Sequence, residues 1–319
     1  MIKRAVELFN EGKIQRLVGL KKGEFDYDLT PHVFLSAEEV EKDFVWNSFA
    51  APNVSKYLVR LKWEDGVTGC FLKPCDTYSF TQLLKEHRVN RDSVYAIGVP
   101  CDEMIDNNKL IEKAGDGIIS VECDGTTVKG ETLYGEFSFP KADVVAERCQ
   151  NCKSRYHVTY DELLGEEGEV LESHRFDQVE MIEKMSPEER FNFWRGELSR
   201  CIRCNACKNV CPACTCEHCI FDNEKSGVSQ KAAADDFEEN MYHIIRAFHV
   251  AGRCTDCGEC SRVCPQQIPL HLLNRKFIKD INEFYGEYQA GSDMTTPYPL
   301  TAYTKGDCEP SIVMTRGEE

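Results

Sequence analysis

Residues 201–219, CIRCNACKNVCPACTCEHC, decide how the second half of this chain folds. Seven of these nineteen residues are cysteine. Four of them follow the spacing C-x2-C-x2-C-x3-C with a proline directly after the last, and they are Cys201, Cys204, Cys207 and Cys211. The same spacing, again closed by a proline, returns at Cys254, Cys257, Cys260 and Cys264. Two copies of one closely spaced cysteine pattern indicate two sites that bind metal through thiolates.

This spacing is typical of bacterial ferredoxins, which hold [4Fe–4S] clusters through it. In two-cluster ferredoxins the first three cysteines of a run bind one cluster and the fourth binds the other. The pattern therefore predicts a cluster 1 bound by Cys201, Cys204, Cys207 and Cys264. It predicts a cluster 2 bound by Cys254, Cys257, Cys260 and Cys211. Zinc is the alternative, but it takes four ligands and leaves the third and fourth cysteine of each run without a role.

The composition favours a reducing environment. The chain has 319 residues, enough for two domains with hydrophobic cores. Its eighteen cysteines gather in runs and are not spread out as in a disulfide-stapled small domain. The formal net charge of -16 argues against a nucleic-acid partner. The amphipathic start of the chain lacks a signal-peptide core and no apolar run is long enough to span a membrane, so we expect a cytoplasmic protein.

Two helices are predicted beside the first cysteine run. Ser186, Pro187 and Glu189 form a capping box at the start of a helix that precedes Cys201. A second helix between the runs carries apolar residues at helical spacing and stops near Gly252. These apolar residues are Phe237, Met241, Ile244, Ile245 and Phe248. Residues 186–280 thereby resemble the α-helical ferredoxin domains of heterodisulfide reductase, succinate dehydrogenase and anaerobic glycerol-phosphate dehydrogenase subunits, which implies an electron relay.

Three further cysteines of the opening stretch, Cys214, Cys216 and Cys219, are not used by the two predicted clusters. A further cluster, or a metal held together with His218, is one interpretation. The other is that they are free thiols near the clusters.

The N-terminal part carries the pattern of an α/β domain. Residues 57–73 predict a hairpin with Asp65-Gly66 at its turn. A helical stripe follows over 77–87 and a short apolar strand over 93–101, and strand, helix and strand together predict a βαβ unit. Cys75 and Cys101 fall just past the carboxyl ends of the two strands, where open α/β sheets build their sites.

Cys149 and Cys152, in the sequence CQNC, add two more thiols. With Cys75 and Cys101 they would suffice for a third [4Fe–4S] cluster. The alternatives are that Cys75 and Cys101 are plain buried thiols, and that Cys149 and Cys152 form a redox pair or half of a zinc site.

The motifs KPCD (73–76), IGVPC (97–101) and CQNC (149–152) resemble those of the beta subunits of coenzyme F420 hydrogenase and F420-type formate dehydrogenase. They are also similar to the beta chain of sulfhydrogenase and the iron–sulfur A subunit of anaerobic sulfite reductase. Over roughly residues 50–155 this resemblance implies a cluster site in an α/β domain. The flavin-binding beta subunits continue with an acidic, glycine-containing segment that residues 153–169 do not match, and there is no G-x-G-x-x-G, so no motif supports FAD.

The remaining chemistry-bearing residues form no catalytic pattern. Cys70, Cys123 and Cys308 are predicted to be structural thiols. No Ser-His-Asp arrangement, phosphate loop or paired carboxylates stand out, so we predict no catalytic residues.

The predicted organisation is an α/β domain over 1–152, a linker over 153–185, an α-helical two-[4Fe–4S] ferredoxin domain over 186–280, and a tail over 281–319 that docks on a partner or is disordered. We expect an iron–sulfur electron-transfer subunit, and not the catalytic one, of a cytoplasmic hydrogenase, formate dehydrogenase or heterodisulfide-reductase-type complex. Its expected partners are a flavoprotein and a catalytic subunit. The alternatives are a flavin-containing beta subunit that exchanges electrons with F420 or NAD(P)H, and a cluster-based sensor.

Overall fold

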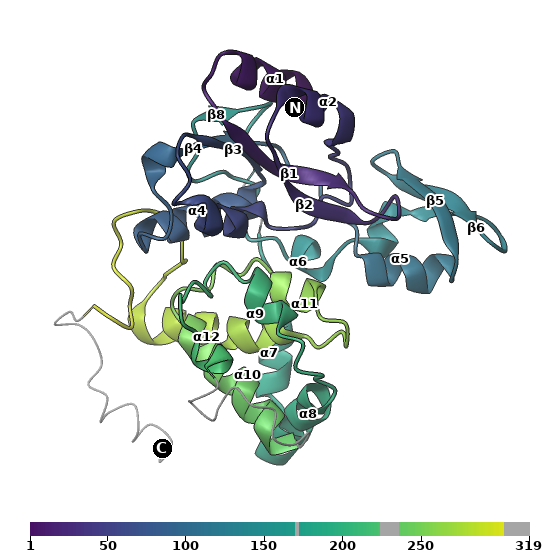
Figure 1. Ribbon diagram of the computed structural model, residues 1–319. Coiled ribbons are helices and arrows are strands. Elements are labelled where there is room, and N and C mark those ends of the chain that lie inside the picture. Colours follow the sequence, from purple (N-terminus) through teal and green to yellow (C-terminus); the bar gives the residue numbers. More distant parts are fainter. Residues whose placement is uncertain (170–171, 224–235, 303–319) are drawn as a thin grey trace. The chain divides into compact units, whose positions relative to one another are not determined.

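The computed structural model describes residues 1–169, 172–223 and 236–302 (Figure 1). The chain divides into two compact units, Met1–Arg175 and Phe176–Glu319. This division falls inside the predicted linker, and the predicted domain boundaries stay predictions.

A five-stranded sheet in the order β2-β1-β3-β4-β8 forms the centre of the first unit. Its strands are β1 (Arg16–Lys22), β2 (Leu29–Phe34), β3 (Thr68–Leu72), β4 (Val94–Gly98) and β8 (Glu162–Leu163). Strands β1 and β2 are antiparallel, whereas β1–β3, β3–β4 and β4–β8 are parallel. Strand β8 lies in the predicted linker, so the start of that segment belongs to the sheet.

Both faces of this sheet are covered by helices, which are α1 (Ile2–Asn10), α2 (Ala37–Asp43) and α4 (Pro74–Lys85). Phe71 and Ile97 enter a core with α1 and α2, and their neighbours Cys70 and Ala96 enter a second core with α4. Successive strand residues point to opposite faces, so α1 and α2 lie on one side of the sheet and α4 on the other (Figure 1). Double coverage explains why every residue of β3 is buried.

The predicted βαβ unit is confirmed, because α4 connects the parallel strands β3 and β4. The predicted hairpin before it is wrong. Residues 54–61 instead form the 3-10 helix η1 (Val54–Tyr57) and the helix α3 (Leu58–Leu61). The Asn53 side chain caps η1 by accepting from the Ser55 N–H, and Val54 and Leu58 are buried one helical turn apart.

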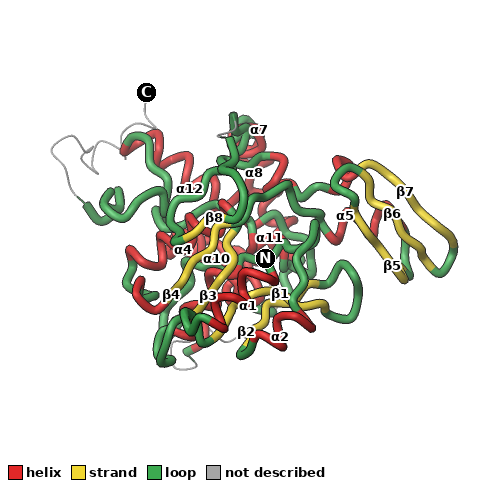
Figure 2. The backbone as a smooth tube through the Cα atoms, turned by 90° about the horizontal axis from the view of Figure 1, so that it is seen from above, coloured by secondary structure: helices red, strands yellow, loops and turns green. Residues whose placement is uncertain are grey.

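A three-stranded antiparallel sheet extends away from the central sheet (Figure 2). It contains β5 (Ile118–Cys123), β6 (Thr127–Thr132) and β7 (Gly135–Pro140), and Cys123 ends the first strand of the β5–β6 hairpin. The other short elements of the first unit are η2 (Arg91–Ser93), α5 (Asn107–Ala114), η3 (Lys141–Val144) and α6 (Glu147–Gln150).

The described part of the second unit is helical. Its elements are α7 (Asp177–Glu183), α8 (Pro187–Ser199), α9 (Ala206–Val210), η4 (Ile220–Asp222), α10 (Asp236–Val250), α11 (Glu259–Arg262) and α12 (Leu270–Tyr285). The capping box is confirmed, because Ser186 accepts from the Glu189 N–H and Glu189 accepts from the Ser186 N–H. Among the described residues, no helix is both long and apolar enough to cross a bilayer.

The predicted helix between the cysteine runs is α10, but its apolar stripe is not its buried face. Phe237 is 74% exposed and Phe248 is 61% exposed. The buried residues lie on the opposite face and are Glu239, Tyr242, His243, Arg246, Ala247 and Val250. This face is turned toward the first cysteine loop, because Tyr242 and His243 line a cavity together with Cys201, Cys204 and Cys207.

The predicted tail begins inside α12, and its described part, 286–302, packs on the second unit. Tyr288 and Ala290 form a small buried core with Ile281. The Tyr288 hydroxyl donates to the Gly252 carbonyl at 3.1 Å. Residues 303–319, including Cys308, lie outside the described residues.

Candidate iron–sulfur sites

The two cysteine loops share one unusual backbone shape. Arg203 and Asn205, in the first loop, have φ angles of 54° and 62°. Asp256 and Gly258 occupy the same two positions of the second loop and have φ angles of 58° and 69°. Left-handed conformations are uncommon outside glycine, so their recurrence at matching positions marks a repeated structural unit.

This backbone turns N–H groups toward sulfur. The Arg203 N–H donates to Cys201 Sγ at 3.3 Å. In the second loop the Asp256 N–H bonds to Cys254 in the same way and counters the rise of its pKa. Backbone donors aimed at cysteine sulfur stabilise thiolate ligands and tune whatever metal they hold.

Residues from both runs line one cavity in the second unit. Its cysteines are Cys201, Cys204, Cys207 and Cys264, the four predicted for cluster 1. The rest of its wall is largely apolar and includes Ile202, Ile268 and Leu270. Burial raises the pKa of Cys201 to about 12. Such thiols stay protonated on their own, and a bound metal is what would displace their protons.

Cys211 faces the cysteines of the second run. It shares a buried cluster with Val250, and Cys254 packs against that cluster. Burial raises the pKa of Cys257 to about 12 and that of Cys260 to about 11, and Cys211 adds to both rises. The structure therefore places Cys211 among the cysteines predicted for cluster 2. The assignment of ligands to clusters stays a prediction.

Buried polar groups beside these thiols fit an iron–sulfur cluster. His243 lines the first cavity, and neither of its ring nitrogens has a hydrogen-bond partner among the described residues. Burial lowers the pKa of His243 to about 3, so its imidazole is neutral and keeps one N–H donor. Asn274 donates to Cys260 Sγ at 3.6 Å. Donors that surround thiols suit a group that presents sulfur acceptors.

Opposite charges occupy the matching positions of the two loops. Arg203 pairs with Glu239 of α10 at 3.0 Å. Asp256 pairs with Arg275 of α12 at 2.8 Å, so the loop residue is a cation in one case and an anion in the other. All four side chains are buried. The two loops therefore share a backbone conformation, but the loop residue of the buried ion pair is positive in the first loop and negative in the second.

In the first unit the structure brings Cys75, Cys101, Cys149 and Cys152 together. Cys75 lies in the first turn of α4, Cys101 follows β4, and Cys149 lies in α6. Burial raises the pKa of Cys101 to about 12, and Cys149 and Cys152 contribute to the rise. Cys101 in turn contributes to the raised pKa of Cys75, after burial and Asp76. The Met104 N–H donates to Cys149 Sγ at 3.4 Å.

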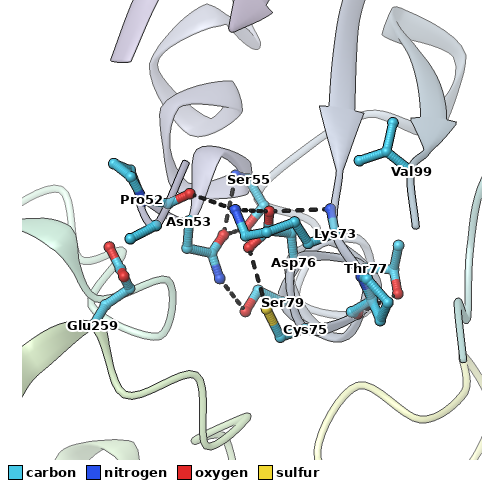
Figure 3. Close-up of polar contacts among 12 residues, drawn as sticks. Pro52, Asn53, Ser55, Lys73, Cys75, Asp76, Thr77, Ser79, Val99 and Glu259 are labelled. Atoms are coloured by element: carbon cyan, nitrogen blue, oxygen red, sulfur yellow. Dashed lines mark hydrogen bonds and ion pairs between the residues drawn. The ribbon is translucent and has the colours of Figure 1, made fainter. Parts of the chain in front are cut away.

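A buried ion pair stands next to this group of thiols (Figure 3). Lys73 is 1% exposed, and its Nζ lies 2.9 Å from Asp76 Oδ2 and donates to the Pro52 carbonyl at 2.8 Å. The Lys73 N–H also donates to Asp76, which closes the turn that presents Cys75. Burial and Asp76 raise the pKa of Cys75 well above its usual value, and Lys73 opposes this rise with a smaller effect.

Cys214, Cys216 and Cys219 differ in their surroundings, and both interpretations of their role stay predictions. Cys214 packs beside Cys211 and Cys254, whereas Cys216 is exposed. Within the described ranges, the one set of three candidate ligand atoms lying within 4.8 Å of one another belongs to Cys201, Glu239 and His243. Of the predicted structural thiols, Cys70 is fully buried in the core.

Several polar residues beside the thiols were not predicted as site residues. They are Lys73, Glu239, His243, Arg246 and Arg275. Lys73 is the first residue of the KPCD motif, in which Cys75 was the available signal. The others lie on α10 and α12, where helical periodicity indicates only an amphipathic helix and the apolar stripe of α10 points away from them.

Comparison with known proteins supports the cluster chemistry. Residues 197–268 match the model of the 4Fe-4S dicluster domain family. The F420-dependent formate dehydrogenase subunit beta of Methanocaldococcus jannaschii is 24% identical, over 91% of this chain and 90% of the relative. The F420-dependent formate dehydrogenase 1 subunit beta of Methanococcus maripaludis is also 24% identical, over 92% and 90%.

Two further matches cover less of this chain. Putative ferredoxin-3 of Sinorhizobium fredii is 33% identical over 23% of this chain and 70% of the relative. A chain of the F420-reducing [NiFe] hydrogenase complex from Methanosarcina barkeri matches 63% of this chain and 86% of its own length, with a TM-score of 0.39 and 13% identity.

The dicluster domain and the paired cysteine loops define the class: the protein is an iron–sulfur electron-transfer subunit of an oxidoreductase complex. Within that class, the chain is homologous to the beta subunits of F420-dependent formate dehydrogenases.

Proposed function

We propose that this chain relays single electrons through three [4Fe–4S] clusters and is not the catalytic subunit of its complex. The observation that carries the proposal is the cavity lined by Cys201, Cys204, Cys207 and Cys264, since it draws its thiols from both cysteine runs. Crossed ligation of this kind keeps two clusters close enough to exchange electrons.

The proposed ligands are those that the spacing predicts. Cluster 1 is bound by Cys201, Cys204, Cys207 and Cys264, and cluster 2 by Cys254, Cys257, Cys260 and Cys211. Cluster 3 is bound in the first unit by Cys75, Cys101, Cys149 and Cys152. The effects of Cys149 and Cys152 on the pKa of Cys101, and of Cys101 on the pKa of Cys75, support the third site.

Bound clusters would supply one-electron carriers, and the residues of this chain set their conditions. Apolar walls such as Ile268 and Leu270 exclude water from the first site. Backbone N–H groups of Arg203 and Asp256 donate to cysteine sulfur and favour the electron-rich state. The buried pair of Lys73 and Asp76 holds the turn that presents Cys75.

The proposed setting is a multi-subunit oxidoreductase of formate dehydrogenase, hydrogenase or heterodisulfide-reductase type. A flavoprotein and a catalytic subunit are the proposed partners. No disulfide joins any of the described cysteines, which suits a reducing compartment such as the cytoplasm.

A second candidate function is a flavin-containing beta subunit that exchanges electrons with F420 or NAD(P)H. The similarity to F420-dependent formate dehydrogenase beta subunits over more than nine-tenths of the chain favours it. FAD is the flavin that this function would require.

Reductive titration under strictly anaerobic conditions tests both candidates. Titanium(III) citrate is added stepwise to the purified chain while absorbance is recorded, and flavin is assayed on the same sample. The relay predicts about three electrons accepted per chain, one for each cluster, without stoichiometric flavin. A chain that accepts no electron contradicts the relay, whereas one flavin per chain and about two extra electrons would select the second candidate.

A further inference from the structure

Arg246 stands out among the buried charges of the second unit. It lies on the buried face of α10 and is 2% exposed. Its Nε and Nη1 atoms are buried and have no hydrogen-bond partner within the part of the chain that the structure describes. Arg203 and Arg275 are also buried, but each of them faces a carboxylate. No ion pair between Arg246 and a carboxylate is present among the described residues.

Cysteine sulfurs of both runs act on the charge of Arg246, and they become thiolates when a bound cluster displaces their protons. Burial opposes its charge, and Cys207, Cys260 and Cys211 together outweigh that effect and raise its pKa. In return, Arg246 counters the burial that raises the pKa of Cys207 and Cys260. Cys207 belongs to the proposed cluster 1, and Cys260 and Cys211 belong to the proposed cluster 2. The fold of α10 agrees with these effects, because Arg246 lies between His243, which lines the cavity of the cluster 1 cysteines, and Val250, which shares a buried cluster with Cys211. Residues three and four apart share one face of a helix, so Arg246 is on the face that meets both ligand sets.

A buried, unpaired guanidinium is costly to the fold unless something accepts its hydrogen bonds. Cluster-bound sulfur is an acceptor and carries negative charge. A cluster that has gained one electron carries one more negative charge than before, and a nearby cation stabilises that state. Solvent does not screen the attraction because the side chain is buried.

We propose that Arg246 sets the reduction potentials of both clusters in the dicluster domain, because it is a single cation shared between them. This role rests on the proposed ligand assignment. Arg246 acts on the clusters through charge and hydrogen bonds to sulfur and is not itself a ligand. Its removal makes both clusters harder to reduce, while a change at any residue next to only one cluster shifts only that cluster.

The test is a potentiometric titration of the full, anaerobically purified chain, followed by electron paramagnetic resonance of the reduced clusters. Arg246→Met and Arg246→Gln are expected to move two midpoint potentials to more negative values. Arg200→Met is the matched control, because Arg200 adjoins Cys201 but is 44% exposed and pairs with Glu197. The control is expected to leave the potentials unchanged, since solvent screens an exposed charge.

Arg246→Lys separates charge from a change of packing. Arg246→Lys keeps the positive charge. The midpoint potentials of the Lys variant are therefore expected to lie closer to the parent values than the potentials of Arg246→Gln do. Potentials that fall equally in the Lys and Gln variants, or stay unchanged in Met and Gln, would overturn the role. If the Met variant loses iron, the Gln and Lys pair gives the decision.

Iron content measured on the same samples keeps two failures apart. A parent chain that binds no iron at the dicluster cysteines refutes the proposed function. Full iron content with unchanged potentials in the uncharged variants refutes only the role of Arg246.

Discussion

Lys73 and Asp76 lie on either side of Cys75 and form an ion pair that water hardly reaches, with side-chain exposures of 1% and 0%. Asp76 accepts from both the backbone N–H and the Nζ of Lys73. One carboxylate therefore caps the start of α4 and balances the charge of the buried lysine. Burying both charges costs desolvation free energy. In return, the ion pair fixes the position of the turn that carries Cys75. The pair is therefore expected to be sensitive to the loss of one member.

Asp76→Asn should destabilise the first unit by about 3–5 kcal/mol, because the Lys73 ammonium is left buried without its anion. Urea denaturation of the iron-loaded chain, followed by circular dichroism, measures the change. Glu11→Gln is the control, since Glu11 pairs with Lys13 at the surface of the same unit and should cause no measurable change. Equal midpoints for Asp76→Asn and the parent chain would contradict the account.

The charge-reversed pairs predict that each dicluster site can be shifted separately. Glu239→Gln leaves Arg203 as a net positive charge beside the first site, and Asp256→Asn leaves Arg275 as one beside the second. Each variant should raise the potential of one cluster and leave the other near its parent value.

Potentiometric titration of both variants measures these shifts. Glu197→Gln is the control, because Glu197 pairs with Arg200, whose side chain is 44% exposed and whose charge is therefore screened by solvent. Two variants that shift the same cluster, or neither cluster, would show that the loops do not serve separate sites.

Among the elements, the shortest helices lie next to the cysteines. Helix α9 has five residues and α11 has four, and each begins after a left-handed residue, Asn205 or Gly258. Helices of this length do not persist on their own in water. Cys207 in α9 and Cys260 in α11 are proposed ligands, so we infer that bound iron holds both helices in place.

Removal of iron should therefore loosen α9 and α11 before the central sheet. Hydrogen exchange followed by mass spectrometry, on the chain before and after anaerobic chelation, is expected to show faster exchange in these two helices. The amides of β3 and β4 are the internal control, because their strands are buried by helices on both faces. Unchanged exchange in α9 and α11 after iron loss would count against cluster-dependent folding.

The same elements show what sequence can and cannot predict here. Cysteine spacing, the capping box at Ser186 and the βαβ unit are local patterns, and the structure contains the helix and strands they indicate. The first strand of the hairpin predicted over 57–73 was wrong because Leu58 and Leu61, three residues apart, suit one face of a helical turn as well as a strand. The buried face of α10 was hidden because its partners, Cys207 and Arg203, are decided by tertiary folding and not by neighbouring residues.

At the scale of the whole molecule, cysteine groups occur in both compact units. The parallel sheet of the first unit presents Cys75 and Cys101 after the carboxyl ends of β3 and β4. The second unit repeats one cysteine loop and reverses the charges beside it. A chain built in this way suits an electron relay through more than one cluster, and its partners would supply the substrate chemistry.

Iron and acid-labile sulfide per chain, measured after strictly anaerobic purification, test the central claim most directly. Three [4Fe–4S] clusters predict about twelve irons and about twelve sulfides per chain. Cys101→Ser should remove about four irons, since a cubane needs four ligands. Cys123→Ser, a substitution in the β5–β6 hairpin of the same unit, should remove none. About eight irons in the parent chain, unchanged by Cys101→Ser, would contradict a third cluster, and a chain without iron or sulfide would contradict the relay itself.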